Sequence, residues 1–225
     1  MIKTKKLVII GDSAFSEVAF ECFTHDSEYE VVGFAVESAY LKKNELFGLP
    51  IIPFEQIDEH FKPCEVEFYA ALVYTQLNRL RTRLYHAAKA KGYRPASYIS
   101  SRVFVWQNVQ FGEHCFIFED NTVQPFVKID NNVVLWSGNH IGHHSLIRDN
   151  CFIASHAVIS GFCDIGENSF IGVNATLANN VKIGKDNWIG PNTAIMKNTE
   201  VGALYRTEQP EPAKVSALRF FKIKE

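Results

Sequence analysis

Every sixth residue of this chain is apolar from position 99 to position 201, and the register does not slip. Since 47% of all residues are apolar, eighteen successive hits in a preset phase have a chance of roughly one in a million. Neither a helix nor a simple sheet has this period, whereas a short fixed repeat is typical of a solenoid. The row consists of Ile99, Val105, Phe111, Ile117, Val123, Ile129, Leu135, Ile141, Ile147, Ile153, Ile159, Ile165, Ile171, Leu177, Ile183, Ile189, Ile195 and Val201.

The other positions of each hexad support a coiled strand-and-turn unit. Four places after an apolar residue the side chain is small or narrow, as at Ser145, Cys151 and Ala157, and glycine often follows the apolar residue directly. We expect each hexad to be a flat strand plus a turn, with glycine or asparagine easing the tight backbone. Three hexads then close a triangular coil, which predicts one parallel β-helix over residues 99 to about 203, with the apolar row inside.

The first part of the chain has a different pattern, in which apolar strands alternate with amphipathic segments. Strands are predicted at 6–13, 29–36 and 65–72, and helices at 13–23, 53–61 and 76–92, with Ser13 as an N-cap and Gly92 as a stop signal. This alternation indicates a small Rossmann-like parallel α/β sheet. We place the α/β domain at 1–96 and the β-helix with its C-terminal tail at 97–225.

Composition excludes several classes of protein. A formal charge of −2 over 225 residues argues against a dedicated nucleic-acid or membrane-surface protein, and no apolar run is long enough to span a membrane. The start "MIKTKKLVIIGDS" is interpreted as a first strand rather than a signal peptide. Five cysteines without paired spacing, three of them at the small inward position (Cys115, Cys151 and Cys163), predict a reduced, cytoplasmic protein.

The repeat resembles a known family. Units such as "IGENSF", "IGVNAT", "IGKDNW" and "IGPNTA" are similar to those of the hexapeptide-repeat acyltransferases, which implies an all-β left-handed parallel β-helix. The two-domain order, together with "IIGDSAFSEVA", "LRTRLYHAAKAKGY", "NHIGHHSLI" and the tail "EPAKVS", resembles bacterial sugar acetyltransferases. That group includes the bacillosamine and perosamine N-acetyltransferases and the sialic acid O-acetyltransferase type.

The resemblance implies a function and an assembly. We expect an acetyl-CoA-dependent transferase that acetylates a sugar directly, most often the amino group of a nucleotide-linked amino sugar used in surface polysaccharide synthesis. Acetylation of a sugar hydroxyl by the same fold is the alternative. The resemblance also implies a homotrimer with sites between subunits, and no metal.

Histidines are concentrated in the repeat, and "His140-Ile141-Gly142-His143-His144" stands out among them. Since Ile141 points inward, His143 and His144 fall at an outer corner of the coil. Acyl transfer to an amine or hydroxyl needs a general base, and histidine suits that task near neutral pH. The resemblance assigns this role to His143, although a structural corner histidine is the competing interpretation.

The residue after the base is often an acid in the family, and here it is His144. Assistance to the base would come from His144 itself or from a nearby carboxylate. The nearby carboxylates are Asp149, Asp164 and Glu167.

Solenoid spacing adds further candidates. Gly161 lies one coil after His143, where its amide can stabilise an oxyanion, and Asn179 lies one coil further in the same column. By resemblance, Val173 and Pro191 line the coenzyme A groove, and Lys214 belongs to the Pro-Ala-Lys that closes many such helices.

Acceptor-binding residues are expected mainly in the first domain. Ligands of open parallel sheets lie beyond the carboxyl ends of the strands, where Ser13, Phe15 and Glu37 fall. The first loop has one glycine rather than a dinucleotide fingerprint, which argues against NAD. Arg81 is a further candidate by resemblance, and His156, on a different corner of the coil, would face His143 across a trimer interface.

Two other classes compete with the transferase. The hexapeptide-type zinc carbonic anhydrases hold a metal between subunits on three histidines, which "HIGHH" invites as a comparison. A non-catalytic β-helix scaffold is the third interpretation.

Overall fold

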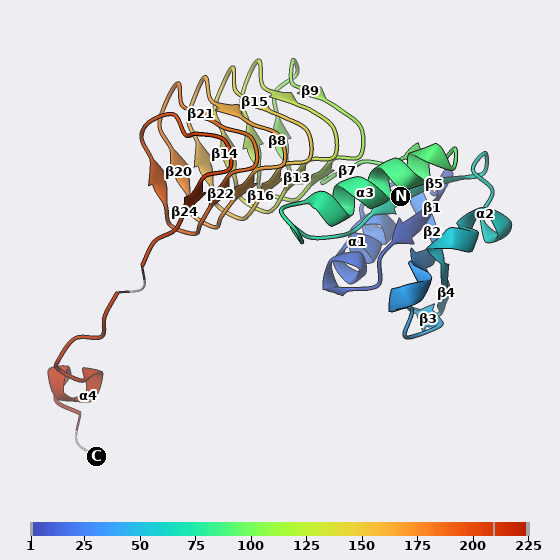
Figure 1. The fold of residues 1–225 in the computed structure, drawn as a ribbon, viewed down its shortest axis with the longest axis horizontal. Helices are drawn as coiled ribbons and strands as arrows, with labels where there is room; N and C mark the ends of the chain where they lie inside the picture. The colour runs from blue at the N-terminus through green and yellow to red at the C-terminus, as the bar shows by residue number, and fades with distance from the viewer. Residues whose placement is uncertain (1, 209, 224–225) are drawn as a thin grey trace.

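The computed structural model describes residues 2–208 and 210–223, and its first part is a six-stranded sheet (Figure 1). The strand order is β3-β4-β2-β1-β5-β6, and all neighbours are parallel except β3 and β4. The predicted parallel α/β sheet is therefore confirmed. The strands are β1 (Lys5–Ile10), β2 (Tyr29–Val36), β3 (Glu45–Leu46), β4 (Leu49–Pro53), β5 (Val66–Ala70) and β6 (Arg94–Pro95).

Helices connect these strands at the predicted places, with three differences in detail. The segment predicted as a helix over 53–61 is a 3-10 turn followed by a four-residue α-helix. Ser13 occupies the N-cap position of α1, but its side chain makes no capping hydrogen bond. α3 begins three residues later than predicted because Gln76, Leu77 and Asn78 all have left-handed backbone conformations. The helices are α1 (Ala14–His25), α2 (Ile57–His60) and α3 (Arg79–Ala90), with short 3-10 turns η1 (Ser38–Tyr40) and η2 (Phe54–Gln56).

Two-residue strands after residue 97 stack into three parallel sheets, which are the faces of a triangular β-helix. The fold is that of the left-handed hexapeptide β-helix. The seven-stranded face holds β7 (Tyr98–Ile99), β10 (Phe116–Ile117), β13 (Val134–Leu135), β16 (Phe152–Ile153), β19 (Phe170–Ile171), β22 (Trp188–Ile189) and β24 (Leu204–Tyr205). The six-stranded face holds β8 (Phe104–Val105), β11 (Thr122–Val123), β14 (His140–Ile141), β17 (Val158–Ile159), β20 (Thr176–Leu177) and β23 (Ala194–Ile195). The five-stranded face holds β9 (Gln110–Phe111), β12 (Lys128–Ile129), β15 (Leu146–Ile147), β18 (Asp164–Ile165) and β21 (Lys182–Ile183).

Three corners join these faces. The first corner leads from the seven-stranded to the six-stranded face, as at 154–157. The second corner leads on to the five-stranded face, as at 142–145, and the third corner returns to the seven-stranded face, as at 148–151. The tail beyond β24 extends away from the β-helix and carries α4 (Ala217–Phe220) (Figure 1).

The apolar row fills the inside of the coil as predicted, except at the two ends of the row. Every member from Ile117 to Ile195 is buried, together with the small inward residues, and all five cysteines are free thiols. Ile99 is 40% exposed and Val201 is 62% exposed, so the prediction that the register holds through Val201 is wrong. Leu204 pairs with Trp188, which makes the last coil two residues shorter than the others and takes Val201 out of the row.

Corner geometry shows why asparagine and glycine recur. From Phe111 to Ile189, the third residue after each inward residue has a left-handed backbone, and asparagine or aspartate often occupies it, as at Asn150 and Asn168. The glycines directly after the inward residue serve another purpose than the expected easing of the turn. A Cβ on Gly142 would lie 2.5 Å from the backbone nitrogen of Gly161, so these glycines let successive coils approach each other closely.

One face of the β-helix is covered by the α/β domain. Outward aromatic residues of the seven-stranded face, including Phe116, Phe152 and Phe170, share a buried cluster with Phe15 and Phe23 of α1. The second corner therefore lies on the side of the triangle opposite to the α/β domain. Within the described residues, no helix is both long and apolar enough to cross a membrane.

Candidate functional site

His143 and His144 project from the second corner, between β14 and β15. Ile141 is buried inside the coil, and both histidines are exposed two and three residues later, as predicted. The backbone N–H of His143 donates to Gln124 Oε1 at 2.9 Å, and that of His144 donates to the carbonyl of Pro125 at 3.1 Å. Hydrogen bonds to the preceding coil thus hold the backbone of both histidines, while their rings face solvent.

The two imidazole rings contact each other and two phenylalanines. Nδ1 of His143 lies 3.1 Å from Nδ1 of His144. The His144 ring stacks between Phe126 and Phe162, with ring centroids 4.5 and 4.7 Å away. Both phenylalanines belong to the same corner column, one coil before and one coil after His144, and sequence reasoning did not single them out. Their spacing of eighteen residues on either side of His144 is the signal that could have found them.

Gly161 lies under the His143 ring, as the coil spacing predicts. A Cβ at this position would come within 2.9 Å of His143 Nε2, so a larger residue here would displace the His143 ring. The Gly161 N–H donates to Asn179 Oδ1 at 2.9 Å, so the amide expected to hold an oxyanion already has an acceptor. The second corner thus places an imidazole nitrogen, a buried glycine amide and a movable amide side chain next to one another.

The other predicted residues of the β-helix lie at the first corner. Val173, Pro191 and His156 are exposed there and are separated from His143 by the six-stranded face. The His156 ring covers Gly138, where a Cβ would lie 2.5 Å from its Nδ1. A single chain therefore does not bring these residues together with His143.

Lys214 lies in the extended tail beyond β24. Among the described residues it forms neither a hydrogen bond nor an ion pair. The structure thus does not bring Lys214 to the second corner as a coenzyme A ligand.

A cavity of about 470 Å³ opens at the carboxyl ends of β1 and β2. Ser13, Glu37 and Arg83 line it, together with apolar residues of α3. Both carboxylate oxygens of Glu37 accept hydrogen bonds from Arg83, each at 2.8 Å. Sequence reasoning did not single out Arg83. The buried face of α3 contains Leu84 and Ala88, so the helical spacing already indicated that position 83 points outward.

Phe15 is not an acceptor-binding residue, in contrast to the sequence-based prediction. Its ring is 3% exposed and packs against Phe116 and Trp136 of the β-helix, with centroids 5.3 and 5.2 Å away. Its place in the helical pattern of α1, four residues before the buried Ala19, is the reason. Phe15 joins the two domains.

Arg81 is likewise a structural residue. It is fully buried, its Nε donates to Asn132 Oδ1, and one terminal nitrogen donates to the carbonyls of Asn132, Asn150 and Cys151. Burial lowers the pKa of its guanidinium to about 10. The prediction that Arg81 binds substrate is therefore wrong, because α3 lies along the third corner and directs this side chain into it.

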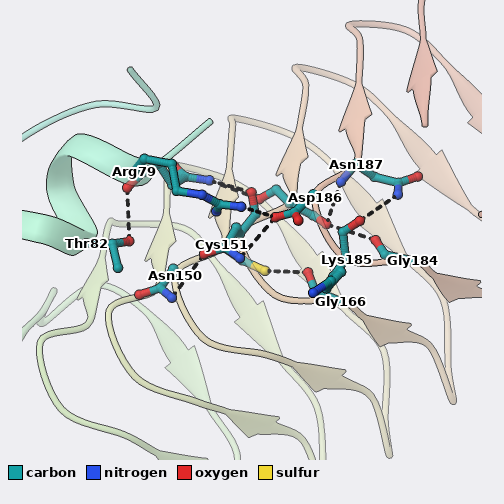
Figure 2. A network of polar contacts seen from close by, with 12 residues as sticks. Arg79, Thr82, Asn150, Cys151, Gly166, Gly184, Lys185, Asp186 and Asn187 are labelled. Atoms are coloured by element: carbon teal, nitrogen blue, oxygen red, sulfur yellow. Dashed lines mark hydrogen bonds and ion pairs between the residues drawn. The ribbon is translucent and has the colours of Figure 1, made fainter. Parts of the chain in front are cut away.

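Neighbouring residues of α3 continue the same contact along the third corner. Asn78, the N-cap residue of α3, donates to the carbonyl of Asn168. Arg79 forms an ion pair with Asp186 (Figure 2). Since Tyr85 and Lys89 also contact Glu113, α3 and its N-cap bond to five successive coils.

Carboxylates considered as partners of His143 are engaged elsewhere. Asp164 forms a two-bond ion pair with Arg148, and Asp149 accepts the backbone N–H of Asn131. Glu167 lies exposed at the third corner. Over residues 2–208 and 210–223, no three His, Cys, Asp or Glu side chains gather as metal ligands.

Comparisons with known proteins agree with this fold. Residues 144–179 match the family described as bacterial transferase hexapeptide (six repeats). The acetyltransferase domain of PglB from Neisseria gonorrhoeae superposes with a TM-score of 0.80 at 20% identity, covering 89% of this chain and 96% of that one.

Two further solved structures share both domains. PerB from Caulobacter crescentus, determined in complex with CoA and GDP-perosamine, has a TM-score of 0.77 at 19% identity, covering 91% of this chain and 95% of that one. WeeI from Acinetobacter baumannii has a TM-score of 0.69 at 18% identity, covering 89% and 96%. No curated protein matches the chain significantly by sequence.

Proposed function

We propose that this protein transfers an acetyl group from acetyl-CoA to the amino group of a nucleotide-linked amino sugar. The observation that carries the proposal is the position of His143 at an exposed corner, with its Nε2 edge directly over Gly161. Similar folds include the PglB acetyltransferase domain, which was determined with acetyl coenzyme A, and PerB, which was determined with CoA and GDP-perosamine.

The proposed chemistry is direct transfer. His143 Nε2 takes a proton from the acceptor amine while the amine nitrogen forms a bond to the carbonyl carbon of the thioester. The carbonyl oxygen, now negatively charged, replaces Asn179 Oδ1 as the acceptor of the Gly161 N–H. The C–S bond then breaks, and the leaving thiolate takes the proton from the imidazolium, which yields CoA and the acetylated amine.

The acceptor is proposed to bind in the cavity beside Ser13 and Glu37. Arg83 and Glu37, one positive and one negative side chain, line this cavity and can form hydrogen bonds to a nucleotide. Amides at the start of α1 add a favourable position for phosphate.

A complete site then needs a second copy of the chain. The α/β domain covers the seven-stranded face, whereas His143 stands at the opposite corner. We therefore propose a trimer in which the second corner of one subunit meets the first corner of its neighbour. In this arrangement Val173 and Pro191 of the neighbour line the coenzyme A groove, and the neighbour's His156 faces His143. Five free cysteines fit a reducing, cytoplasmic location.

The test is an acetyl transfer assay with purified protein, acetyl-CoA and a panel of amino sugars linked to UDP, GDP or dTDP. Release of free CoA and the mass of the product are measured together. Each amino sugar is paired with the analogue that carries a hydroxyl in place of the amine.

An amide product from one nucleotide-linked amino sugar is expected, at a rate that falls when the nucleotide is removed. Ester formation on the hydroxyl analogue alone would replace the proposal with sugar O-acetylation. Binding of acetyl-CoA without turnover on any acceptor would favour a scaffold.

A further inference from the structure

The contact between the two corner histidines restricts how protons are arranged on them. Nδ1 of His143 and Nδ1 of His144 are 3.1 Å apart, so one carries the hydrogen and the other accepts it. If His144 donates, His143 must keep its hydrogen on Nε2 and has no lone pair over Gly161. If His143 donates, its Nε2 is unprotonated and can take a proton from an acceptor.

The environment of His144 fixes its ring. Phe126 and Phe162 stack on its two sides, with interplanar angles of 27° and 17°, while Phe162 meets the His143 ring edge-on at 89°. All three residues of this column have left-handed backbone conformations, with φ between 60° and 63°. Such a conformation is costly for bulky side chains, and this column carries histidine and phenylalanine where other corners often carry asparagine or aspartate.

We propose that His144 is the positioning residue of His143: it accepts the Nδ1–H of His143 and so holds Nε2 as the basic nitrogen. The inference rests on the proposed acetyl transfer. His144 does not touch the reacting atoms. It sets the tautomer and the orientation of the ring that does, a role for which a hydrogen-bonding partner on the far nitrogen of a histidine is well suited.

The consequence is a neutral pair without a carboxylate. The described side chains in contact with the two rings are Phe126 and Phe162, and the backbone of His143 is held by the Gln124 amide; none of these is charged. Protonation of His144 at Nδ1 removes the acceptor, and protonation of His143 at Nε2 removes the base. A single proton added to either ring therefore disables the pair.

Three substitutions at position 144 separate positioning from structure. His144→Gly keeps the left-handed backbone free of strain and removes the acceptor. His144→Asn also tolerates this backbone, and its Oδ1 occupies the place of Nδ1 but does not titrate. His144→Asp places a carboxylate oxygen there. Asp120→Gly is the matched control, because Asp120 has the same backbone conformation (φ 58°) at the first corner.

We expect His144→Gly to lower kcat by about 10–100-fold, as loss of such an orienting partner commonly does, with KM for acetyl-CoA changed less than about twofold. His144→Asn should restore most of kcat. The acid limb of log(kcat/KM) against pH should keep a slope of about one in the wild type and in His144→Asn, because a single protonation already removes activity and a second adjacent positive charge is repelled. His144→Asp should move this limb to higher pH, because a carboxylate favours the protonated imidazole.

Failure of the inference differs from failure of the proposed function. Wild-type kcat in His144→Gly, or an acid limb that stays in place in His144→Asp, overturns the role of His144 while acetyl transfer stands. Absence of acetyl transfer by the wild type removes the proposed function itself. Equal losses in Asp120→Gly and His144→Gly would show that the corner backbone, and not the imidazole contact, controls the rate.

Discussion

His114 and His144 occupy the same position of the hexad, yet the structure gives them opposite surroundings. Both lie three residues after an inward residue and have left-handed backbones, with φ of 58° and 60°. His114 is fully buried at the third corner, accepts the N–H of Ala70 and bonds to Asn132 Oδ1, whereas His144 is exposed. The hexad thus determines the backbone, and the neighbouring domain determines the chemistry.

The third and second corners differ in the same way as these two histidines. At the third corner, α3 supplies partners for the carbonyls of successive coils, and burial lowers the pKa of His114 to about 3. The described residues of the chain leave the second corner without such cover. Its histidines and phenylalanines remain accessible, which is where we place catalysis.

Replacing Arg81 should have the largest effect on folding. Arg81→Leu removes the donor for one side-chain oxygen and three carbonyls in a buried site. Loss of such a partner costs about 3–5 kcal/mol of unfolding free energy. Chemical denaturation at a fixed protein concentration measures this loss of unfolding free energy.

Arg79→Leu is the matched control on the same helix. Its ion pair with Asp186 is partly exposed, so we expect about 0–1 kcal/mol. Equal effects of the two substitutions would contradict the view that α3 is held through the buried arginine.

A second comparison tests the register of the inner row. Ile165 is fully buried, and Ile165→Ala should cost about 2–5 kcal/mol by opening a cavity. Val201 is exposed beside the shortened last coil, so Val201→Ala should change stability by less than about 0.5 kcal/mol. A large loss at Val201 would restore the unbroken row predicted from sequence.

Stability should also depend on pH through His114. Its pKa is depressed in the fold, from the ordinary value of 6.5 to about 3, so only the unfolded chain takes up a proton between these values. The unfolding free energy should be highest above pH 6.5 and fall by up to about 1.4 kcal/mol per pH unit below it.

The window from about pH 6.5 to 5 is the informative one, because Asp26 and Glu113, whose pKa values are also lowered, contribute only below it. The left-handed backbone tolerates His114→Asn, which cannot titrate. We expect this variant to be less stable at pH 7 but to show a flatter pH dependence. An unchanged slope would mean that His114 is not the responsible group.

Periodicity predicted the solenoid because burial repeats with the hexad, and it placed His143 and Gly161 in one column correctly. The acceptor-binding roles of Phe15 and Arg81, taken from the parallel-sheet rule and the family resemblance, failed because both side chains pack against the β-helix. Only the docked structure shows that carbonyls of the third corner accept the hydrogen bonds of Arg81. The prediction for Val201 failed because the final coil is two residues shorter than the others, which the spacing of apolar residues in the sequence does not reveal.

The most direct test of the catalytic role of the second corner is the turnover of His143→Ala on the nucleotide-linked amino sugar, measured with its affinity for coenzyme A. We expect kcat to fall by about 10²–10⁴ while the affinity stays near that of the wild type, because a general base acts only in the transition state. His60→Ala, at an exposed histidine of the α/β domain, should have wild-type kinetics. A wild-type rate in His143→Ala, or a larger loss of kcat in His144→Gly than in His143→Ala, would show that the base lies elsewhere.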